Sequence, residues 1–503
     1  MKKIIINDTP WQTRIAIITH GKLQNIYFST PTHEVLERAY FKGTITKVLP
    51  GIQTAFVEFG QERAGFLHIS EIDRELAMHK ISKHLEDYDE EDHKIEKKSI
   101  QKRDISKILN EGETILVQVS KEPVYEKGAK LTTCFTLPGR FIVLMPNIPR
   151  IGVSKKIEDR DERMRLKTII KTHLPEGMGA IIRTTSDGRK EEDLIKDLNY
   201  LVQEWHTIDK KFNQAKSAEK IFEDLPLVLQ IVRDHLDHDV EAIITDSKKS
   251  LDDLYKTTKQ IAPEFAHVIQ LYQNDMGIFS TYGIEKQIEQ ALKKKVILKS
   301  GGSIVVESTE AMTVVDVNTG RFIGKSNLEE TIVKTNLEAA EEVVNQLKLR
   351  NIGGLIVIDF IDMAIAANRQ KVFSSFEKIL RERDKFQSVV LKISEFGLVQ
   401  MTRKRTGKTL VNELTDSCQT CNGLGFVKSH QTESYAILRH IQPDLLKFPH
   451  GTKLEVHVNP HIFNYLTSIE YNAILKLEES FKGKITLLSS KELTTDKYKI
   501  EKK

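Results

Sequence analysis

Long apolar runs and cysteines are scarce in this sequence of 503 residues. No uninterrupted apolar stretch approaches the roughly 20 residues of a membrane-spanning helix, so we expect no membrane association. The apolar run at residues 4–6 is ended by residues 7–10, much too early for a signal peptide. Three cysteines cannot build a disulfide framework, and two of them form a C-x-x-C pair. We therefore expect a cytoplasmic protein whose cysteine pair has a metal or redox role.

An excess of charge of one sign is also lacking. The 75 Lys and Arg residues nearly balance the 71 Asp and Glu residues, which leaves a net charge of +4. Such mild basicity excludes a general polycation, so nucleic-acid binding would require local basic patches. The hydrophobic fraction of 40% and the charged fraction of 29% are those of a globular protein. At this length the chain is too long for one core and predicts roughly three to five domains.

Two carboxylates stand where strongly apolar runs end. The run at residues 353–358 ends in Asp359, and the β-branched run at residues 312–315 ends in Asp316. Apolar runs of this kind predict buried strands, where an unpaired acid carries a desolvation cost and calls for a cation. For either run alone, the alternative is a strand end that emerges into solvent. Asp362 lies beyond its strand and is expected to have a supporting role at most.

The segment between these two acids predicts a crossover connection. Residues 326–329 form an S-x-x-E capping box that opens a helix reaching about residue 349. A strand, a helix and a strand then place Asp316 and Asp359 at the same carboxyl edge of a parallel pair. Asn318 lies on the same strand face as Asp316, and these oxygen ligands suit Mg²⁺, with Mn²⁺ as the alternative. Such a metal can position water for attack on phosphorus, so the block predicts phosphodiester hydrolysis; a general-base pair without metal is the alternative.

Short strands at residues 41–48, 55–60 and 65–70, separated by turns, predict a small closed barrel. Phe56 and Phe66 would lie on one face of this barrel, where aromatic rings can stack on bases. The alternative places both rings in the barrel core. A charged segment at 79–104 is interpreted as an insertion within the barrel.

An apolar strand at residues 180–184 ends in Arg183 and Thr184. A guanidinium fork beside a hydroxyl donor makes a compact hook for a phosphate, although an arginine at a strand end is also an ordinary surface residue. The opening hairpin at residues 13–28 cannot bury itself alone, so we pair it with the block at residues 229–290.

Further cations are expected to contact the RNA backbone. Lys127 lies in a loop of flexible cations, and the run at residues 397–405 ends in Arg403, Lys404 and Arg405. We interpret these side chains as phosphate contacts, while the alternative is a solvated turn and a solvated charge run.

The pair Cys418 and Cys421 stands in a C-x-x-C-x-G-x-G pattern with no second pair or histidine nearby. Structural zinc takes four ligands, so two chains would each contribute one pair, which predicts a zinc-linked homodimer. A redox dithiol is the rival interpretation, but we expect no thioredoxin-like βαβ setting around it. Cys134 is interpreted as a small core residue.

Taken together, these motifs resemble the ribonuclease E/G family. The matching segments are residues 174–184, 300–303, 310–320, 347–363 and 397–406, together with the barrel motifs. The resemblance implies an endoribonuclease that cuts single-stranded RNA in rRNA and tRNA processing and mRNA decay. It also implies 5′-phosphate and 3′-hydroxyl products and a preference for 5′-monophosphorylated substrates.

The resemblance further assigns roles to individual residues. Asp316 and Asp359 would ligate the catalytic Mg²⁺ with Asn318 in support, and the barrel residues Phe56, Phe66 and Lys127 would contact RNA. A pocket for a 5′-monophosphate would consist of Gly139, Val143, Lys155, Arg183 and Thr184, with Lys155 standing where the family pattern often has Arg. Gln419 departs from the proline that commonly follows the first cysteine.

The fold class implied is multidomain α/β and β. The expected regions are a split, noncatalytic ribonuclease H-like domain (1–37 with 229–290), an OB-fold RNA-binding barrel (38–132), a 5′-phosphate sensor (133–228), a DNase I-like catalytic domain (291–413), a zinc link (414–427) and a small C-terminal α/β domain (428–503). The expected partners are single-stranded RNA and a second copy of the chain, with a higher homo-oligomer as a further option and no small-molecule cofactor.

Two other functions fit parts of the sequence. A noncatalytic RNA-binding or scaffold protein could retain the same fold, but it would have no use for the acid pair Asp316 and Asp359. A deoxyribonuclease follows from the acids alone, whereas the barrel favours RNA.

Overall fold

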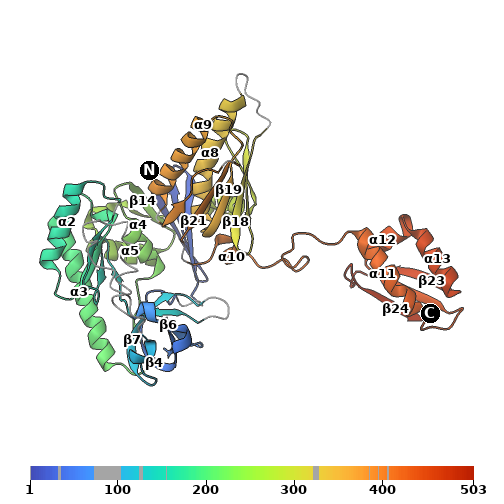
Figure 1. Cartoon of the computed structure of the whole chain (residues 1–503), viewed down its shortest axis with the longest axis horizontal. Helices are drawn as coiled ribbons and strands as arrows, with labels where there is room; N and C mark the ends of the chain where they lie inside the picture. Colours follow the sequence, from blue (N-terminus) through green and yellow to red (C-terminus); the bar gives the residue numbers. More distant parts are fainter. Residues whose placement is uncertain are drawn as a thin grey trace. The chain divides into compact units, whose positions relative to one another are not determined.

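The computed structural model describes residues 2–31, 35–72, 104–123, 128–154, 156–320, 328–384, 386–394, 396–404 and 407–502 (Figure 1). The chain forms two compact units, Met1–Glu413 and Leu414–Lys503. The larger unit contains four of the five β-sheets. None of the helices in the described ranges combines the length and apolarity needed to cross a bilayer.

One mixed sheet of the larger unit carries the two acids. Its order is β16 (Lys295–Ile297), β17 (Ser303–Ser308), β18 (Met312–Asn318), β19 (Gly354–Asp359), β21 (Leu398–Arg403) and β20 (Ser388–Val390). Helices α8 (Leu328–Leu349) and α9 (Ala366–Arg383) run beside each other along this sheet (Figure 1). Strands β18 and β19 are parallel, which confirms the predicted crossover. The first two residues of the expected capping box lie outside the described residues.

Strand alternation gives this sheet two different faces. Ile356 and Ile358 of β19 are buried in one core with Val344 of α8 and Phe376 of α9. Leu355, which directly precedes Ile356, lies on the opposite face of the strand, and its side chain is 40% exposed. Because successive side chains of a strand point to opposite faces, Asp359 belongs with Leu355 on the open face.

The opening strands join a sheet that is completed much later in the chain. Its order is β15 (Ile269–Leu271), β14 (Val240–Thr245), β1 (Lys2–Asp8), β2 (Thr13–Thr19) and β3 (Lys22–Ser29). The parallel pairing of β1 with β14 confirms that the opening segment needs the block at 229–290. The helices of this part are α4 (Leu227–His235), α5 (Lys248–Ile261), α6 (Ile278–Thr281) and α7 (Ile284–Leu292).

The predicted barrel is present. The sheet order is β13 (Lys220–Phe222), β4 (Tyr40–Leu49), β5 (Thr54–Glu58), β6 (Gly65–His68), β8 (Lys130–Thr132) and β7 (Thr114–Lys121). Five strands close on themselves because β4 also pairs with β7. The interior is filled by alternate side chains such as Ile45, Val57 and Leu67. Nearly all of the expected insertion, residues 79–103, lies outside the described residues.

The part of the sequence between the barrel and the acid-bearing sheet includes a small sheet covered by two helices. The strands are β11 (Ile151–Val153), β12 (Gly179–Ile182), β10 (Ile142–Met145) and β9 (Leu137–Pro138), and the helices are α2 (Arg160–His173) and α3 (Glu191–Gln214). Asp159 caps α2 by accepting hydrogen bonds from the N–H groups of Asp161 and Glu162, as an N-cap carboxylate should.

The smaller unit has a three-stranded sheet in the order β23 (Lys484–Ser489), β22 (Lys453–Val458) and β24 (Tyr498–Lys502). Its helices are α11 (His430–Leu445), α12 (Pro460–Ser468) and α13 (Tyr471–Phe481), and the short α10 (Leu410–Leu414) precedes it. Strands β22 and β23 are parallel and joined through α12 and α13. The mixture of helices and strands agrees with the α/β character expected for residues 428–503.

Candidate active site and phosphate pocket

The two predicted acids are neighbours. Asp316 and Asp359 lie directly opposite each other in the parallel register of β18 and β19. The Nδ2 of Asn318 donates a hydrogen bond to Asp316 Oδ2 at 2.6 Å. The structure therefore brings all three predicted side chains to one edge of the sheet.

The acids differ from the prediction in their burial. Both Asp316 and Asp359 are exposed, so the expectation of a buried acid at each strand end is wrong, although some desolvation still acts on Asp359. The reason is strand alternation, which turns Asp359 to the open face while Ile358 enters the core. Within the described parts of the chain, no cationic side chain forms an ion pair with either acid.

The electrostatics of this edge come from like charges. Residual desolvation, then the charges of Asp316 and Asp362, raise the pKa of Asp359 above its usual value. Asp362, expected to be at most a supporting residue, thus acts on Asp359 through its charge. Neighbouring carboxylates that repel each other favour either a shared proton or a bound cation.

The donor set can be compared with what a divalent metal requires. No cluster of three or more His, Cys, Asp or Glu side chains with metal-site geometry occurs in the described ranges. Two adjacent carboxylates and an amide fit a hard cation that keeps several water ligands, as Mg²⁺ does, better than a site built entirely of protein ligands. The residues present are therefore compatible with Mg²⁺ or Mn²⁺.

Gly139, one of the residues predicted to bind a phosphate, lies in the turn between β9 and β10. The carboxylate of Asp197 on α3 accepts hydrogen bonds from the backbone N–H groups of Arg140, Phe141 and Ile142. A Cβ atom on Gly139 would lie 2.5 Å from Asp197 Oδ2, so this position requires glycine. Burial raises the pKa of Asp197, against the lowering effect of these hydrogen bonds.

Arg183 and Thr184 follow β12 on the same sheet. Val143 pairs with Pro138 on one side and with Ile181 on the other, which places it next to the strand that Arg183 follows. The Thr184 hydroxyl lies 3.1 Å from Ser154 Oγ. Thr184 is exposed and Arg183 half-buried, so both can meet a ligand from solvent. Lys155 lies outside the described residues.

Sequence reasoning missed the partner of Arg183. Its Nη1 lies 2.6 Å from Asp234 Oδ1 on α4, which precedes the sheet strand β14. Burial alone would raise the pKa of Asp234, but Arg183 and Arg233 outweigh it and lower this pKa to about 2. No local pattern near residue 234 indicates this contact, because the two residues are 51 positions apart.

On the barrel, Phe56 and Phe66 are direct cross-strand neighbours in the antiparallel pair β5 and β6. Both are partly exposed, while Ala55, Val57 and Leu67 fill the core. The alternative that placed both rings in the core is therefore wrong. Lys127 lies outside the described residues.

Comparison with known proteins settles the relationship. A family model described as Ribonuclease E/G family matches residues 136–406. Ribonuclease G of Haemophilus influenzae is 39% identical over 482 residues, covering 96% of this chain and 95% of that protein. The chain belongs to the Ribonuclease E/G family. Ribonuclease G of Escherichia coli (strain K12) is 37% identical across 95% of this chain and 94% of its own length. Ribonuclease E of the same strain is 35% identical across 99% of this chain but only 46% of its own length.

The basic run of this family member needs a correction. Arg403 is 2% exposed, with its Nε 2.6 Å from Asp384 Oδ2 and its Nη2 3.0 Å from Asp384 Oδ1. The prediction that Arg403 contacts RNA phosphates is wrong, because the guanidinium is held in a buried bidentate pair. Lys404 is exposed, and Arg405 lies outside the described residues.

The cysteine pair stands in a tight turn ahead of α11. Asn422 N donates to Cys418 O at 2.7 Å, and Gly425 N to Cys421 Sγ at 3.4 Å. Backbone and side-chain hydrogen bonds from Cys421 and Thr420 lower the pKa of Cys418, which favours the thiolate that binds metal. Cys134 packs beside Met145 and Ile148, as a small core residue would.

A second family model, described as RNase E/G, Thioredoxin-like domain, matches residues 417–503. The turn of Cys418 and Cys421 precedes α11 and does not follow a strand of the β22–β23 unit, so this match does not place the pair in a βαβ redox setting.

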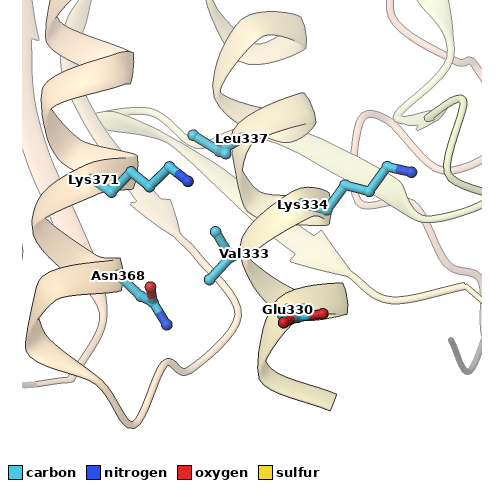
Figure 2. A pocket seen from close by; sticks show the side chains of 6 residues that line it. All are labelled: Glu330, Val333, Lys334, Leu337, Asn368 and Lys371. Atoms are coloured by element: carbon cyan, nitrogen blue, oxygen red, sulfur yellow. The ribbon is translucent and has the colours of Figure 1, made fainter. Parts of the chain in front are cut away.

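A depression of about 290 Å³ lies between α8 and α9. Its lining is Glu330, Val333, Lys334 and Leu337 of α8 with Asn368 and Lys371 of α9. Lys371 extends toward α8, whereas Lys334 points away from α9 (Figure 2). None of the predicted site residues lines this depression.

Proposed function

We propose that this chain is a metal-dependent endoribonuclease that cuts single-stranded RNA to leave 5′-phosphate and 3′-hydroxyl ends. Membership of the Ribonuclease E/G family makes it an endoribonuclease, which is a hydrolase. The observation that carries the metal dependence is the register of Asp316 and Asp359, with Asn318 bonded to Asp316. Its substrates would be rRNA and tRNA precursors and decaying mRNA.

The residues of the edge have separate tasks. Asp316 and Asp359 would hold Mg²⁺ or Mn²⁺, which supplies activation of a water and stabilisation of the leaving oxygen. Asn318 fixes the rotamer of Asp316 by its 2.6 Å hydrogen bond. The charge of Asp362 raises the pKa of Asp359 and so strengthens the need for a cation.

The 5′-end preference rests on the pocket around the β9–β10 turn. Gly139, Val143, Arg183 and Thr184, together with Lys155, would receive one phosphate group. The guanidinium and hydroxyl donors suit a monophosphate, while a triphosphate is larger and more highly charged. RNA would continue over Phe56 and Phe66, with Lys127, Lys404 and Arg405 as backbone contacts.

The remaining assignments complete the proposal. The sheet of β1 and β14 would be a noncatalytic ribonuclease H-like domain, the barrel an OB-fold and the acid-bearing sheet DNase I-like. Cys418 and Cys421 would share zinc with the same pair of a second chain, which gives a homodimer and leaves open a higher homo-oligomer. We place the enzyme in the cytoplasm.

The test is cleavage of a 5′-labelled single-stranded RNA with and without Mg²⁺. Wild-type protein should cut only with the metal, and Asp359→Asn should reduce kcat by roughly 10²–10³-fold because one metal ligand becomes neutral. The matched control is Asp239→Asn, the same substitution in an exposed pair with Lys2. If Asp359→Asn cut RNA at the wild-type rate, Asp316 and Asp359 would not hold a catalytic metal, and the proposal would be wrong.

A further inference from the structure

Five charged side chains alternate in sign from the phosphate pocket to the barrel. Arg183 Nη1 lies 2.6 Å from Asp234 Oδ1, and Arg233 Nε lies 3.4 Å from the same oxygen. Arg233 then holds Asp224 through Nη1 at 2.8 Å and Nη2 at 3.3 Å. Asp224 Oδ2 is 3.3 Å from Arg38 Nη1. These contacts form one continuous ion-pair chain, with Arg183 and Arg38 at its ends.

The centre of this chain is buried and its ends are not. Arg233 and Asp224 are 5% and 7% exposed, whereas Arg183 and Arg38 are 24% and 38% exposed. Buried charges are screened weakly by water and salt, so each link responds to its neighbours. A ligand can reach the two ends, and the centre can transmit a change between them.

Each end is fixed to a different part of the larger unit. Arg183 directly follows β12 of the pocket sheet. Arg38 precedes β4, and its backbone N–H donates to Val119 O of β7 at 2.8 Å. Arg38 also has φ +70°, a conformation that residues other than glycine adopt at a cost. Its ion pair with Asp224 therefore helps to stabilise the entry of the chain into the barrel.

We propose that Asp234 is a positioning residue for the candidate 5′-phosphate pocket, and that the chain from Asp234 through Arg233 and Asp224 to Arg38 couples occupation of this pocket to the RNA-binding barrel. The proposal rests on the 5′-end preference proposed above.

Orientation of Arg183 supplies the mechanism. In the structure Asp234 binds one nitrogen of the guanidinium, Nη1, and so holds the side chain in place for an arriving monophosphate with about −1.5 to −2 charges. The longest link of the chain is the 3.4 Å contact between Arg233 and Asp234, which can shorten when Asp234 loses part of its hold on Arg183. Any shift of Arg233 toward Asp234 weakens the ion pair between Arg233 and Asp224. Asp224 is then less firmly fixed, and its contact with Arg38 changes as well.

The coupling is reciprocal by thermodynamic necessity. If phosphate at Arg183 changes the affinity of the barrel for RNA, RNA on the barrel changes the affinity of the pocket for phosphate by the same factor. Residues in the middle of the chain, which do not touch Arg183, should therefore influence the response to a 5′-phosphate. A merely structural role for Asp224 or Asp234 would not do so.

The experiment compares one RNA sequence carrying either a 5′-monophosphate or a 5′-hydroxyl group, with Mg²⁺ present. The measured quantity is the ratio of the two kcat/KM values. We expect Asp234→Asn to lower this ratio about five- to tenfold and Asp224→Asn about two- to fivefold, both mainly through KM of the monophosphorylated RNA. Asp234→Glu should recover most of the ratio, and the control Asp239→Asn should leave it unchanged.

Two outcomes separate this proposal from the one on which it rests. A wild-type ratio of one would overturn the 5′-end preference and the coupling together. A wild-type ratio above one that survives both Asp234→Asn and Asp224→Asn would overturn the coupling alone. If a buried-chain variant fails to fold, as melting would reveal, Arg38→Gln at the exposed end takes its place and should lower the ratio about twofold.

Discussion

At the edge of the acid-bearing sheet two carboxylates lie side by side, whereas in the candidate phosphate pocket the guanidinium of Arg183 already has a carboxylate partner. The pKa values follow this difference. That of Asp359 is raised by residual desolvation and by its acidic neighbours, while that of Asp234 is lowered to about 2 by two arginines that outweigh its burial. A cation would relieve repulsion at the first site, and an anion would share Arg183 with Asp234 at the second.

This contrast explains why the two sites should respond differently to their ligands. Binding of Mg²⁺ by Asp316 and Asp359 would remove an unfavourable interaction between them. Binding of a phosphate at Arg183 would add a second anionic partner to the guanidinium, so its affinity would depend on the position in which Asp234 holds the arginine. On the proposed function, the first site would serve catalysis and the second selectivity.

The buried ion pair of Arg403 and Asp384 extends the comparison, because two hydrogen bonds join its side chains, whereas one contact joins Arg183 to Asp234. Both side chains are at most 2% exposed. Arg403→Gln would leave Asp384 as a buried charge without its bidentate partner, and we expect it to lower the free energy of unfolding by about 3–5 kcal/mol. Urea denaturation measures this loss.

Lys404→Gln is the matched control on the adjacent, exposed position. It should leave stability within about 0.5 kcal/mol and weaken RNA binding slightly. If Arg403→Gln instead weakened RNA binding and left the urea midpoint unchanged, Arg403 would be a phosphate contact after all.

Acid titration of stability should show opposite signs at the two sites. The folded pKa of Asp234 lies below the unfolded value of 3.8, so its stabilisation is present above about pH 4 and is lost as the pH falls toward 2. Asp234→Asn should therefore cost about 2 kcal/mol at pH 7 and progressively less below pH 4. Unfolding free energies from pH 7 down to pH 3 measure this difference.

Asp359 provides the counterpart. Its folded pKa is raised, so the favourable contribution belongs to the protonated form and is lost as the pH rises through the folded pKa. Asp359→Asn should then be at least as stable as wild type at pH 7 in the absence of metal. A clear loss of stability in this variant would mean that Asp359 has a cationic partner and would remove the contrast between the sites.

The sequence predicted the acid pair because local signals sufficed. A helix between two apolar runs that each end in an acid implies a parallel pair, and Asp316 does lie opposite Asp359. Pairing of β1 with β14 was predictable in the same way, from a hairpin that cannot bury itself.

Other features depended on signals that were overlooked or absent. The buried position of Arg403 could have been predicted from strand alternation, because Arg403 falls on the same face as the apolar residues Val399 and Met401, which are buried. Asp234 gave no such signal, because its contact with Arg183 depends on how α4 packs against another region of the chain. The strand–helix–helix–strand unit at the end of the chain was overlooked, although Ile462 and Leu466 of α12 and Ile474 and Phe481 of α13 are apolar positions at helical spacing.

The smallest expected effect concerns the barrel, where affinity would come from stacking and not from charge. Phe56→Leu and Phe66→Leu keep an apolar side chain but remove the ring, so each should raise the Kd for single-stranded RNA about tenfold, within the 1–3 kcal/mol of base stacking. Gel-shift titration at two salt concentrations should show an unchanged salt dependence, because no phosphate contact is lost.

Phe59→Leu is the control: this ring is 1% exposed and packs edge-on against Phe41, so the substitution should lower stability without a matching loss of affinity. If all three variants lost affinity in proportion to stability, Phe56 and Phe66 would be structural residues like Phe59, and RNA recognition would rest on the charged sites alone.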